Sequence, residues 1–231
     1  MGMLIQGLIV SCQAEEGSPF NSPQFIAAFA KAAEVGGAVG VRVRDCENVR
    51  AVAEVTDLPI IGLTKGQFES GSVLVTPTKD DVLRLVDSGA DIIAFDATSR
   101  RRPGGMSGVE FLRSLRSVTT CPLLADISNL GEALSAADEG ADYIATTLSG
   151  YVEGLPASKY EPDYTLIREL ASRTNTPVIA EGRIWSPAQA RMAANYGAFA
   201  VCIGSAITRP VDIVRRFVDA LSGNEPAEKE E

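Results

Sequence analysis

The stretch Gly89-Ala-Asp-Ile-Ile-Ala-Phe95 decides the fold, because its pattern occurs four times in the chain. Gly-Ala followed by an apolar run also begins at Gly37, Gly140 and Gly197, at intervals of roughly 50 residues. A glycine in this place fits the left-handed position after a helix, and the apolar run fits a strand covered on both faces. Each occurrence therefore predicts a helix that ends just before a buried strand.

A second pattern lies between these stretches and places proline before an apolar run. It occurs as Pro59-Ile-Ile-Gly-Leu63, Pro122-Leu-Leu-Ala-Asp126 and Pro177-Val-Ile-Ala-Glu181. Proline is tolerated at the first residue of a strand, so these runs also predict strands. With a first strand over Leu8–Gln13, the chain has eight apolar runs, and the Gly-Ala interval spans two strand–helix units.

Between the predicted strands lie segments in which apolar residues recur at helical spacing. The clearest predicted helices are Phe25–Val35, Asp80–Asp87, Gly108–Val118, Leu130–Glu139, Tyr164–Arg173 and Pro187–Tyr196. Ser22, Thr78 and Ser186 precede three of these helices and are good N-cap residues.

Alternating strands and helices predict a parallel sheet with right-handed crossovers. An open doubly wound sheet is the competing architecture. Eight similar units with a fourfold repeat favour closure, so we predict a single (β/α)8 TIM barrel over residues 1–221, followed by a polar acidic tail over 222–231. The length of 231 residues fits one such barrel.

Composition limits the chemistry and the partners. The formal net charge of −9 argues against a nucleic-acid partner. The chain contains no histidine, so acid–base chemistry must use Lys, Asp, Glu, Tyr or Cys, and a zinc site would need unusual ligands. We therefore expect no metal.

The cysteines and the N-terminus point to the cytoplasm. The four cysteines are scattered without a CxxC pair, which is typical of reduced thiols. The first apolar run is too short for a signal peptide or a membrane span, and we expect a cytoplasmic protein.

Polar groups follow almost every predicted strand, and in a TIM barrel these strand ends surround the active site. The sets are Ser11-Cys12-Gln13, Arg42-Val43-Arg44, Thr64-Lys65, Asp96-Ala97-Thr98, Asp126-Ile127-Ser128, Thr146-Thr147 with Ser149-Gly150, Glu181-Gly182-Arg183, and Gly204-Ser205. We expect them to converge at one mouth.

Lys65, Asp126 and Glu181 form the candidate acid–base cluster at this mouth. Lys65 could be a surface lysine, a proton-transfer base or a Schiff-base amine. Burial or neighbouring cations would lower its pKa and activate it. Either acidic residue could instead be a helix cap or a solvated loop residue.

The loops after the last two strands predict a phosphate site. Gly182-Arg183 and Gly204-Ser205, with Arg209 further on, could surround an anion with backbone N–H groups and guanidinium donors. A glycine turn with a solvated arginine is the alternative. The run Arg100-Arg101-Arg102 could be a solvated loop, a patch facing a partner, or a guide for an anionic substrate.

Nine stretches, taken together and in order, resemble the N-acetylmannosamine-6-phosphate 2-epimerase family of the ribulose-phosphate-binding barrel group. They are GLIVSCQA, GGAVGVR, PIIGLTK, TPT, FDAT, ADIS, TTLSGY, IAEGRI and IGSAITRP, and the resemblance covers Gly7 to about Leu221.

The resemblance implies a reaction and a set of roles. The reaction is inversion of C2 of an N-acylmannosamine 6-phosphate through an enolate, in sialic acid degradation, without a cofactor. Lys65, Glu181 and Asp126 match the catalytic positions of the family. Further residues match its substrate-binding and phosphate-binding positions. Substrate contacts are Gln13, Arg42, Asp96, Thr98, Gly150 and Tyr151; phosphate contacts are Gly182, Arg183, Gly204, Ser205 and Arg209.

One matching position departs from the family pattern. Relatives often carry lysine where this chain has Arg183, which keeps the charge but changes the contact geometry. A homodimer is one option for the assembly. Two alternative functions remain: a Schiff-base lyase or another isomerase that uses Lys65, and a phosphosugar-binding protein without activity. In the epimerase reaction, one base or two could serve the two faces of C2.

Overall fold

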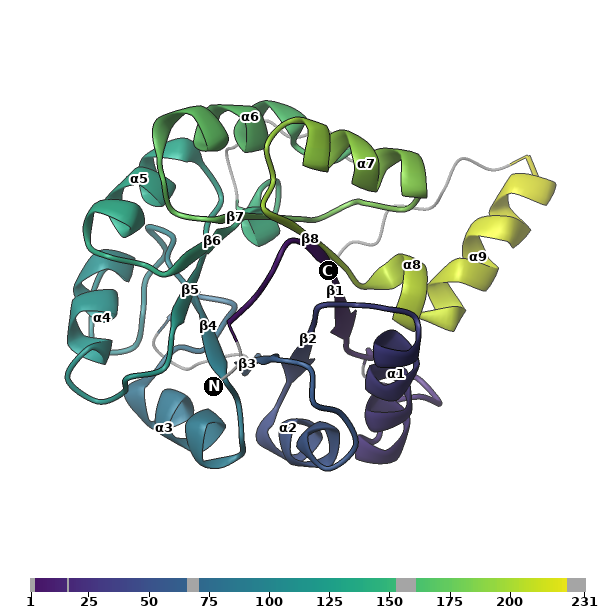
Figure 1. The fold of residues 1–231 in the computed structure, drawn as a ribbon, viewed down its shortest axis with the longest axis horizontal. Coiled ribbons are helices and arrows are strands. Elements are labelled where there is room, and N and C mark those ends of the chain that lie inside the picture. Colours follow the sequence, from purple (N-terminus) through teal and green to yellow (C-terminus); the bar gives the residue numbers. More distant parts are fainter. Residues whose placement is uncertain (1–2, 16, 66–70, 153–160, 224–231) are drawn as a thin grey trace.

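Eight parallel strands close into a barrel in sequence order, and helices surround it (Figure 1). The computed structural model describes residues 3–15, 17–65, 71–152 and 161–223. The predicted closed barrel is confirmed, and the open doubly wound sheet is excluded. Most of the predicted tail, residues 224–231, lies outside the described residues.

The strands have the following bounds. They are β1 (Gly7–Cys12), β2 (Gly40–Arg44), β3 (Ile60–Leu63), β4 (Ile92–Asp96), β5 (Leu123–Asp126), β6 (Tyr143–Ala145), β7 (Val178–Glu181) and β8 (Ala200–Ile203). The helices are α1 (Pro23–Val35), α2 (Cys46–Ala53), α3 (Lys79–Asp87), α4 (Gly108–Leu115), α5 (Leu130–Asp138), the 3-10 turn η1 (Thr146–Leu148), α6 (Tyr164–Arg173), α7 (Pro187–Asn195), α8 (Ser205–Thr208) and α9 (Pro210–Leu221).

The predicted boundary residues occupy the expected places. Gly37, Gly89, Gly140 and Gly197 all have φ between +84° and +100°, which confirms the left-handed position before each strand. Thr78 and Ser186 form capping boxes at the starts of α3 and α7, whereas Ser22 precedes α1 without a side-chain cap bond.

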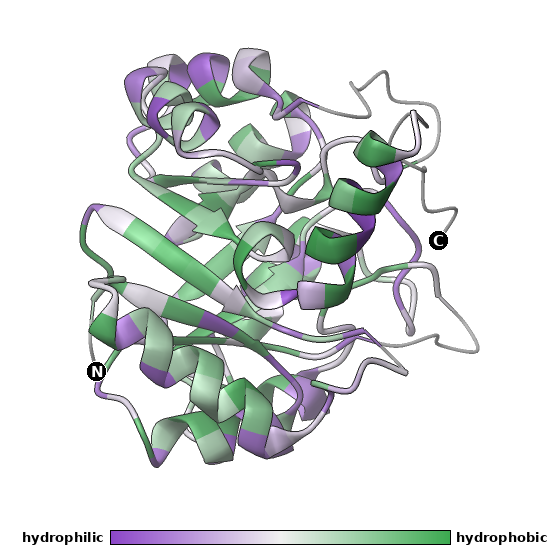
Figure 2. Ribbon diagram, turned by 90° about the vertical axis from the view of Figure 1, so that its right-hand side faces the viewer, coloured by the Kyte–Doolittle hydropathy of each residue, from purple (hydrophilic) through white to green (hydrophobic). Residues whose placement is uncertain are grey.

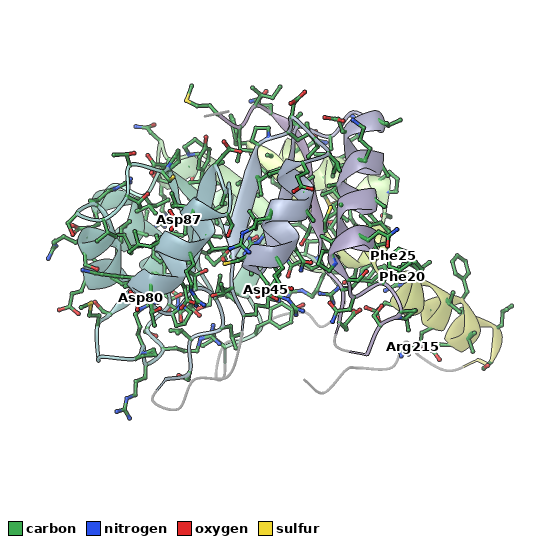
Figure 3. The ribbon with its side chains drawn as sticks, turned by 90° about the horizontal axis from the view of Figure 1, so that it is seen from below. Phe20, Phe25, Asp45, Asp80, Asp87 and Arg215 are labelled. Atoms are coloured by element: carbon green, nitrogen blue, oxygen red, sulfur yellow. The ribbon has the colours of Figure 1, made fainter. Side chains whose placement is uncertain are left out.

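Helix α2 was not among the predicted helices. It is only eight residues long, and Val49 and Val52 are its buried side chains, so its apolar pattern is too short to stand out. Asp45 precedes it with φ of 71°. Figure 3 shows Asp45 and Asp80, at the amino ends of α2 and α3, near one end of the barrel and Asp87 nearer the other.

Alternation along the strands separates the barrel interior from the layer beneath the helices. The interior cluster includes Ile9, Ile61, Leu63, Ile92, Ala94, Leu124, Tyr143, Ala145, Ile179, Ala200 and Cys202. Their neighbours along the strands, such as Val10, Val41 and Ile93, pack instead against the helices. The inward-facing rows of four strands continue, two residues further on, into a polar side chain. The same alternation therefore brings these side chains to the carboxyl-terminal end of the barrel; they are Arg42, Asp96, Asp126 and Glu181.

The opposite end of the interior is filled by the N-terminal segment. Leu4 packs into the interior cluster, and its backbone N–H donates to the Tyr143 hydroxyl at 3.3 Å. Figure 1 shows this purple segment crossing the opening of the barrel. The other end, formed by the carboxyl termini of the strands, is the end at which the active sites of TIM barrels lie.

Helix α9 departs from the ring of helices and projects away from the barrel (Figure 1). Figure 2 shows hydrophobic residues along it. Val214, Phe217, Val218 and Leu221 are exposed, Phe217 by 69% and Leu221 by 89%. No helix in the described ranges is long and apolar enough to cross a membrane.

Candidate active site

The centre of the barrel mouth is an arginine held between two carboxylates. Arg42, on β2, is 1% exposed, and its Nη1 and Nη2 atoms donate to the two oxygens of Asp126 on β5, at 2.9 and 2.6 Å. Nη1 also contacts Glu181 Oε2 on β7 at 2.7 Å. Thr147 accepts from Arg42 at 3.1 Å and donates to Asp126 at 2.6 Å. We call these four residues the arginine–carboxylate cluster.

Burial and charge act in opposite directions within this cluster. Burial alone would lower the pKa of Arg42, but Asp126 and Glu181 outweigh it and raise that pKa above its usual value. Burial also raises the pKa of Asp126, against the opposing charge and hydrogen bonds of Arg42. The two carboxylate contacts of Arg42 therefore keep its guanidinium protonated despite its burial.

The two carboxylates differ in access. The Asp126 side chain is fully buried, whereas the Glu181 side chain is 15% exposed. Asp126 therefore holds Arg42 from within the barrel, and Glu181 is the carboxylate that a ligand at the mouth can reach.

Cys202 lies in the same interior and was not a predicted site residue. It is the register partner of Glu181 across β7 and β8. Burial, and then the charge of Glu181, raise the pKa of its thiol well above the usual range, so it stays protonated. Strand alternation from Ala200 could have placed it in the interior.

Lys65 lies two residues beyond the end of β3, as predicted, and its side chain is exposed. Ile61 and Leu63 face the barrel interior, and Lys65 follows Leu63 by two residues, beyond the last residue of the strand. The preceding residue is fixed by paired bonds: the Thr64 N–H donates to Thr76 Oγ1 at 3.1 Å, and the Thr76 N–H donates to the Thr64 carbonyl at 3.0 Å.

Asp96 and Thr98 form a separate group at the end of β4. The buried Asp96 carboxylate accepts from the Thr98 hydroxyl at 2.6 Å, from the backbone N–H groups of Thr98 and Leu74 at 3.0 and 2.8 Å, and from Arg100 Nη2 at 2.7 Å. Their polar atoms are thus used within the protein, and their predicted substrate contacts stay a prediction.

The arginine run after β4 is not a uniform surface patch. Arg102 is 1% exposed and donates to the carbonyls of Thr76, Pro77 and Asp96. Its guanidinium lies 3.9 Å from the centre of the Phe111 ring. The predictions of a solvated loop, a partner patch or a substrate guide are therefore wrong for Arg102, although Arg101 is exposed.

Arg183 is drawn into the loop after β6. Its Nη1 donates to the Ser149 carbonyl at 2.6 Å and its Nε to the Glu161 carbonyl at 2.8 Å, and the guanidinium lies 5.8 Å from the Tyr151 ring. Gly182 and Arg183 have φ of 112° and 58°, and Gly150 has φ of 84°. The structure therefore joins the predicted sugar loop to the predicted phosphate loop.

The end of β1 is joined to α8. Gln13 Nε2 donates to Ser11 Oγ at 2.9 Å, and Thr208 Oγ1 donates to the Ser11 carbonyl at 2.6 Å. A Cβ on Gly204 would lie 3.2 Å from that of Ser11, so only glycine leaves this approach unstrained. Ser205 begins α8.

Arg209 follows α8, and its Nη1 contacts Glu15 at 3.0 Å. The predicted phosphate residues thus lie in the two loops after β7 and β8, with both arginines bound to groups of the protein itself. Within the described ranges, no group of three or more His, Cys, Asp or Glu side chains is arranged to hold a metal ion.

Comparisons with known proteins agree with this architecture. Residues 26–223 match the family described as "Putative N-acetylmannosamine-6-phosphate epimerase". A relative from Caldanaerobacter subterraneus, described as a 2-epimerase of the same substrate, is 47% identical over 93% of this chain and 91% of its own. One from Yersinia pseudotuberculosis with the same description is 45% identical over 94% and 91%.

Solved structures give the same result. The N-acetylmannosamine-6-phosphate 2-epimerase from Clostridium perfringens is 37% identical, with a TM-score of 0.87 over 92% of both chains. A thiamine phosphate pyrophosphorylase from Pyrococcus furiosus shares only the fold, at 17% identity and a TM-score of 0.59 over 88% of this chain and 87% of its own. The chain belongs to the N-acetylmannosamine-6-phosphate epimerase family.

Proposed function

We propose that this protein interconverts N-acetylmannosamine 6-phosphate and N-acetylglucosamine 6-phosphate by inverting C2, as a step of sialic acid catabolism. The observation that carries this proposal is Arg42, bound between Asp126 and Glu181 at the mouth of a barrel of this family. Neither a Schiff-base lyase nor a simple binding protein needs two carboxylates on one buried arginine.

The reaction follows from the acidity of C2. The C2 proton is acidic only when C1 is a carbonyl, so the open-chain aldehyde is the reactive form. Removal of the proton gives an enolate, and its return to the other face gives the epimer. Donors that are already in place stabilise the enolate oxygen without reorganisation.

We assign the C2 proton to Lys65. It lies two residues beyond β3 at the mouth, and its neutral amine can take the C2 proton and return it from the ammonium form. Glu181 handles hydroxyl protons during ring opening, because its side chain is the accessible carboxylate. Asp126 acts by holding Arg42 in place.

The remaining contacts are assigned by position. Gln13, Gly150 and Tyr151 border the mouth and contact the sugar in this proposal. The phosphate group binds at Gly182, Arg183, Gly204, Ser205 and Arg209. Arg183 and Arg209 would exchange part of their present partners for phosphate oxygens. Asp96 and Thr98, also predicted as substrate contacts, would likewise have to exchange part of their present partners for the sugar.

Proton NMR on N-acetylmannosamine 6-phosphate tests this function directly. The expected result is conversion to an equilibrium mixture of the two epimers. Cleavage products, or covalent trapping of substrate on Lys65 by borohydride, would establish a Schiff-base lyase instead. A thermal shift with the phosphosugar but no conversion would leave a binding protein.

We also propose a homodimer formed through α9. Val214, Phe217, Val218 and Leu221 recur at helical spacing and form one exposed apolar stripe on this helix. A second copy is the matching partner, because a two-fold axis pairs the same stripe with itself. Light scattering should give twice the 24.4 kDa mass of one chain, and Phe217→Ser should give the single mass.

Val35→Ser, a change at an exposed residue of α1, is the matched control and should leave the dimer intact. A wild-type protein with the mass of one chain would remove the dimer proposal. We further propose that the reaction takes place in the cytoplasm without a nucleic-acid partner, which four free cysteines and a net charge of −9 support.

A further inference from the structure

We infer that Arg102 is a positioning residue for Lys65, acting through residues 72–77 and Thr64. This inference rests on the proposed function, since it gives Arg102 a part in the same proton transfer. The relevant contacts join the loop after β4 to residues 72–77, which precede α3. We call Thr64, Thr76, Asp96 and Arg102 the β3–β4 brace.

Arg102 is the centre of the brace. Its Nη1 donates to the carbonyls of Thr76 and Pro77 at 3.1 and 3.0 Å, and its Nη2 donates to the Asp96 carbonyl. Phe111 covers one side of the guanidinium. One side chain thus connects the end of β4 with the segment before α3.

Thr76 passes this restraint to the residue beside Lys65. Its φ of 41° is unusual for a β-branched residue, so surrounding contacts must hold it. Those contacts are the Arg102 bond to its carbonyl and the two bonds that it exchanges with Thr64. Because Thr64 directly precedes Lys65, the position of Thr76 determines where the backbone of Lys65 lies beyond the end of β3.

Asp96 fixes the same segment at two further points. Its backbone N–H donates to the Val75 carbonyl at 3.0 Å, and its carboxylate accepts from the Leu74 N–H at 2.8 Å. The Arg101 carbonyl accepts from the Ser72 N–H at 2.7 Å. Residues 72–76 are therefore held along their length by the last residue of β4 and by the loop that carries the arginine run.

The chemistry of the site favours arginine over lysine. Burial lowers the pKa of Arg102 to about 10, with Asp96 opposing this shift. Three carbonyl acceptors and an aromatic face replace the water that the charge has lost. A lysine lacks the planar fork that reaches separate carbonyls while stacking on a ring.

The test compares Arg102→Met and Arg102→Lys with Arg101→Met, which removes an exposed arginine from the same run as a matched control. Calorimetric titration with the equilibrium mixture of the two phosphosugars measures the number of binding-competent sites per protein molecule. The turnover number kcat is then expressed per binding-competent site. We expect kcat to fall by about tenfold or more in Arg102→Met with KM within about threefold, since small displacements of a catalytic group are costly.

Arg102→Lys should recover part of the lost kcat, and Arg101→Met should match the wild type. If Arg102→Met does not fold, Thr76→Val and Thr76→Ser serve in its place. Valine removes the acceptor for the Thr64 N–H and should lower kcat per site, whereas serine keeps this acceptor and should preserve the rate.

The inference is overturned if kcat per binding site is unchanged in the Arg102 variants, because Arg102 would then act on stability alone. A raised KM with unchanged kcat also overturns it, in favour of a role in binding. Failure of the proposed function is distinguishable, since neither the wild type nor Arg101→Met would then epimerise the substrate.

Discussion

The arginine–carboxylate cluster and the β3–β4 brace lie at the same mouth but are built in different ways. In the cluster, side chains bond to side chains on different strands, and Arg42 and Asp126 are buried. In the brace, side chains hold backbone groups of loops, and the proposed proton carrier beyond it, Lys65, is exposed. The cluster is part of the barrel interior, whereas the brace positions the loop segments at the mouth of the barrel.

This difference separates two requirements of the proposed reaction. Charges that stabilise an enolate are effective when they are fixed in advance, and strands of a closed barrel provide that rigidity. A group that takes a proton from one place and returns it to another needs some freedom of its side chain. Loss of the cluster should therefore affect stability and activity together, and loss of Lys65 should affect activity alone.

Replacement of Lys65 should give the largest effect on activity. Lys65→Met removes the proton carrier, and kcat should fall by roughly 10²–10⁴-fold, the range typical of general acid–base groups. The melting temperature should stay close to that of the wild type, because the side chain is exposed. Kinetics and thermal unfolding check both parts, and near-normal activity would defeat the assignment of Lys65.

Replacement of Arg42 should give the largest effect on stability. Arg42→Met leaves Asp126 and Glu181 without their shared cation, and the free energy of unfolding should fall by about 3–5 kcal/mol. Urea denaturation measures this change. Arg44→Met, which removes a partly exposed arginine from the same strand, is the control and should change stability little. Equal stability of the two variants would contradict the account of the cluster.

Thiol modification should give a smaller signal that reports on the same interior. Burial raises the pKa of Cys12 to about 12 and that of Cys202 well above its usual range. Alkylation requires the thiolate, so at pH 8 iodoacetamide should react with the partly exposed Cys46 well before the other cysteines. Peptide mass spectrometry checks the order, and rapid labelling of Cys202 would mean that the barrel interior is open to solvent.

Much of the fold was predictable because the sequence repeats one structural unit. The glycine at the start of each Gly-Ala stretch has the positive φ that its position requires, and proline precedes three of the strands. The residues after the strands were predictable for the same reason, since closure of the barrel brings all strand ends together. Arg42, Asp126 and Glu181 are joined by geometry that no single segment contains.

The surroundings of the arginine run were not predictable in this way. Three consecutive arginines suggest a solvated loop, and the burial of Arg102 depends on Phe111 and on carbonyls from the preceding loop. The interior position of Cys202 follows from strand alternation, but its contact with the charged cluster needs the register between β7 and β8. Tertiary contacts, rather than local pattern, decide both cases.

Exchange of the C2 proton with solvent is the most direct readout of proton transfer by Lys65. Proton NMR in D2O, with wild type and Lys65→Met in parallel, follows the C2 signal of N-acetylmannosamine 6-phosphate. We expect deuterium at C2 during wild-type turnover, and both exchange and epimerisation slowed by roughly 10²–10⁴-fold in the variant. Wild-type turnover without any deuterium at C2, or exchange at the wild-type rate without Lys65, would contradict proton transfer by Lys65.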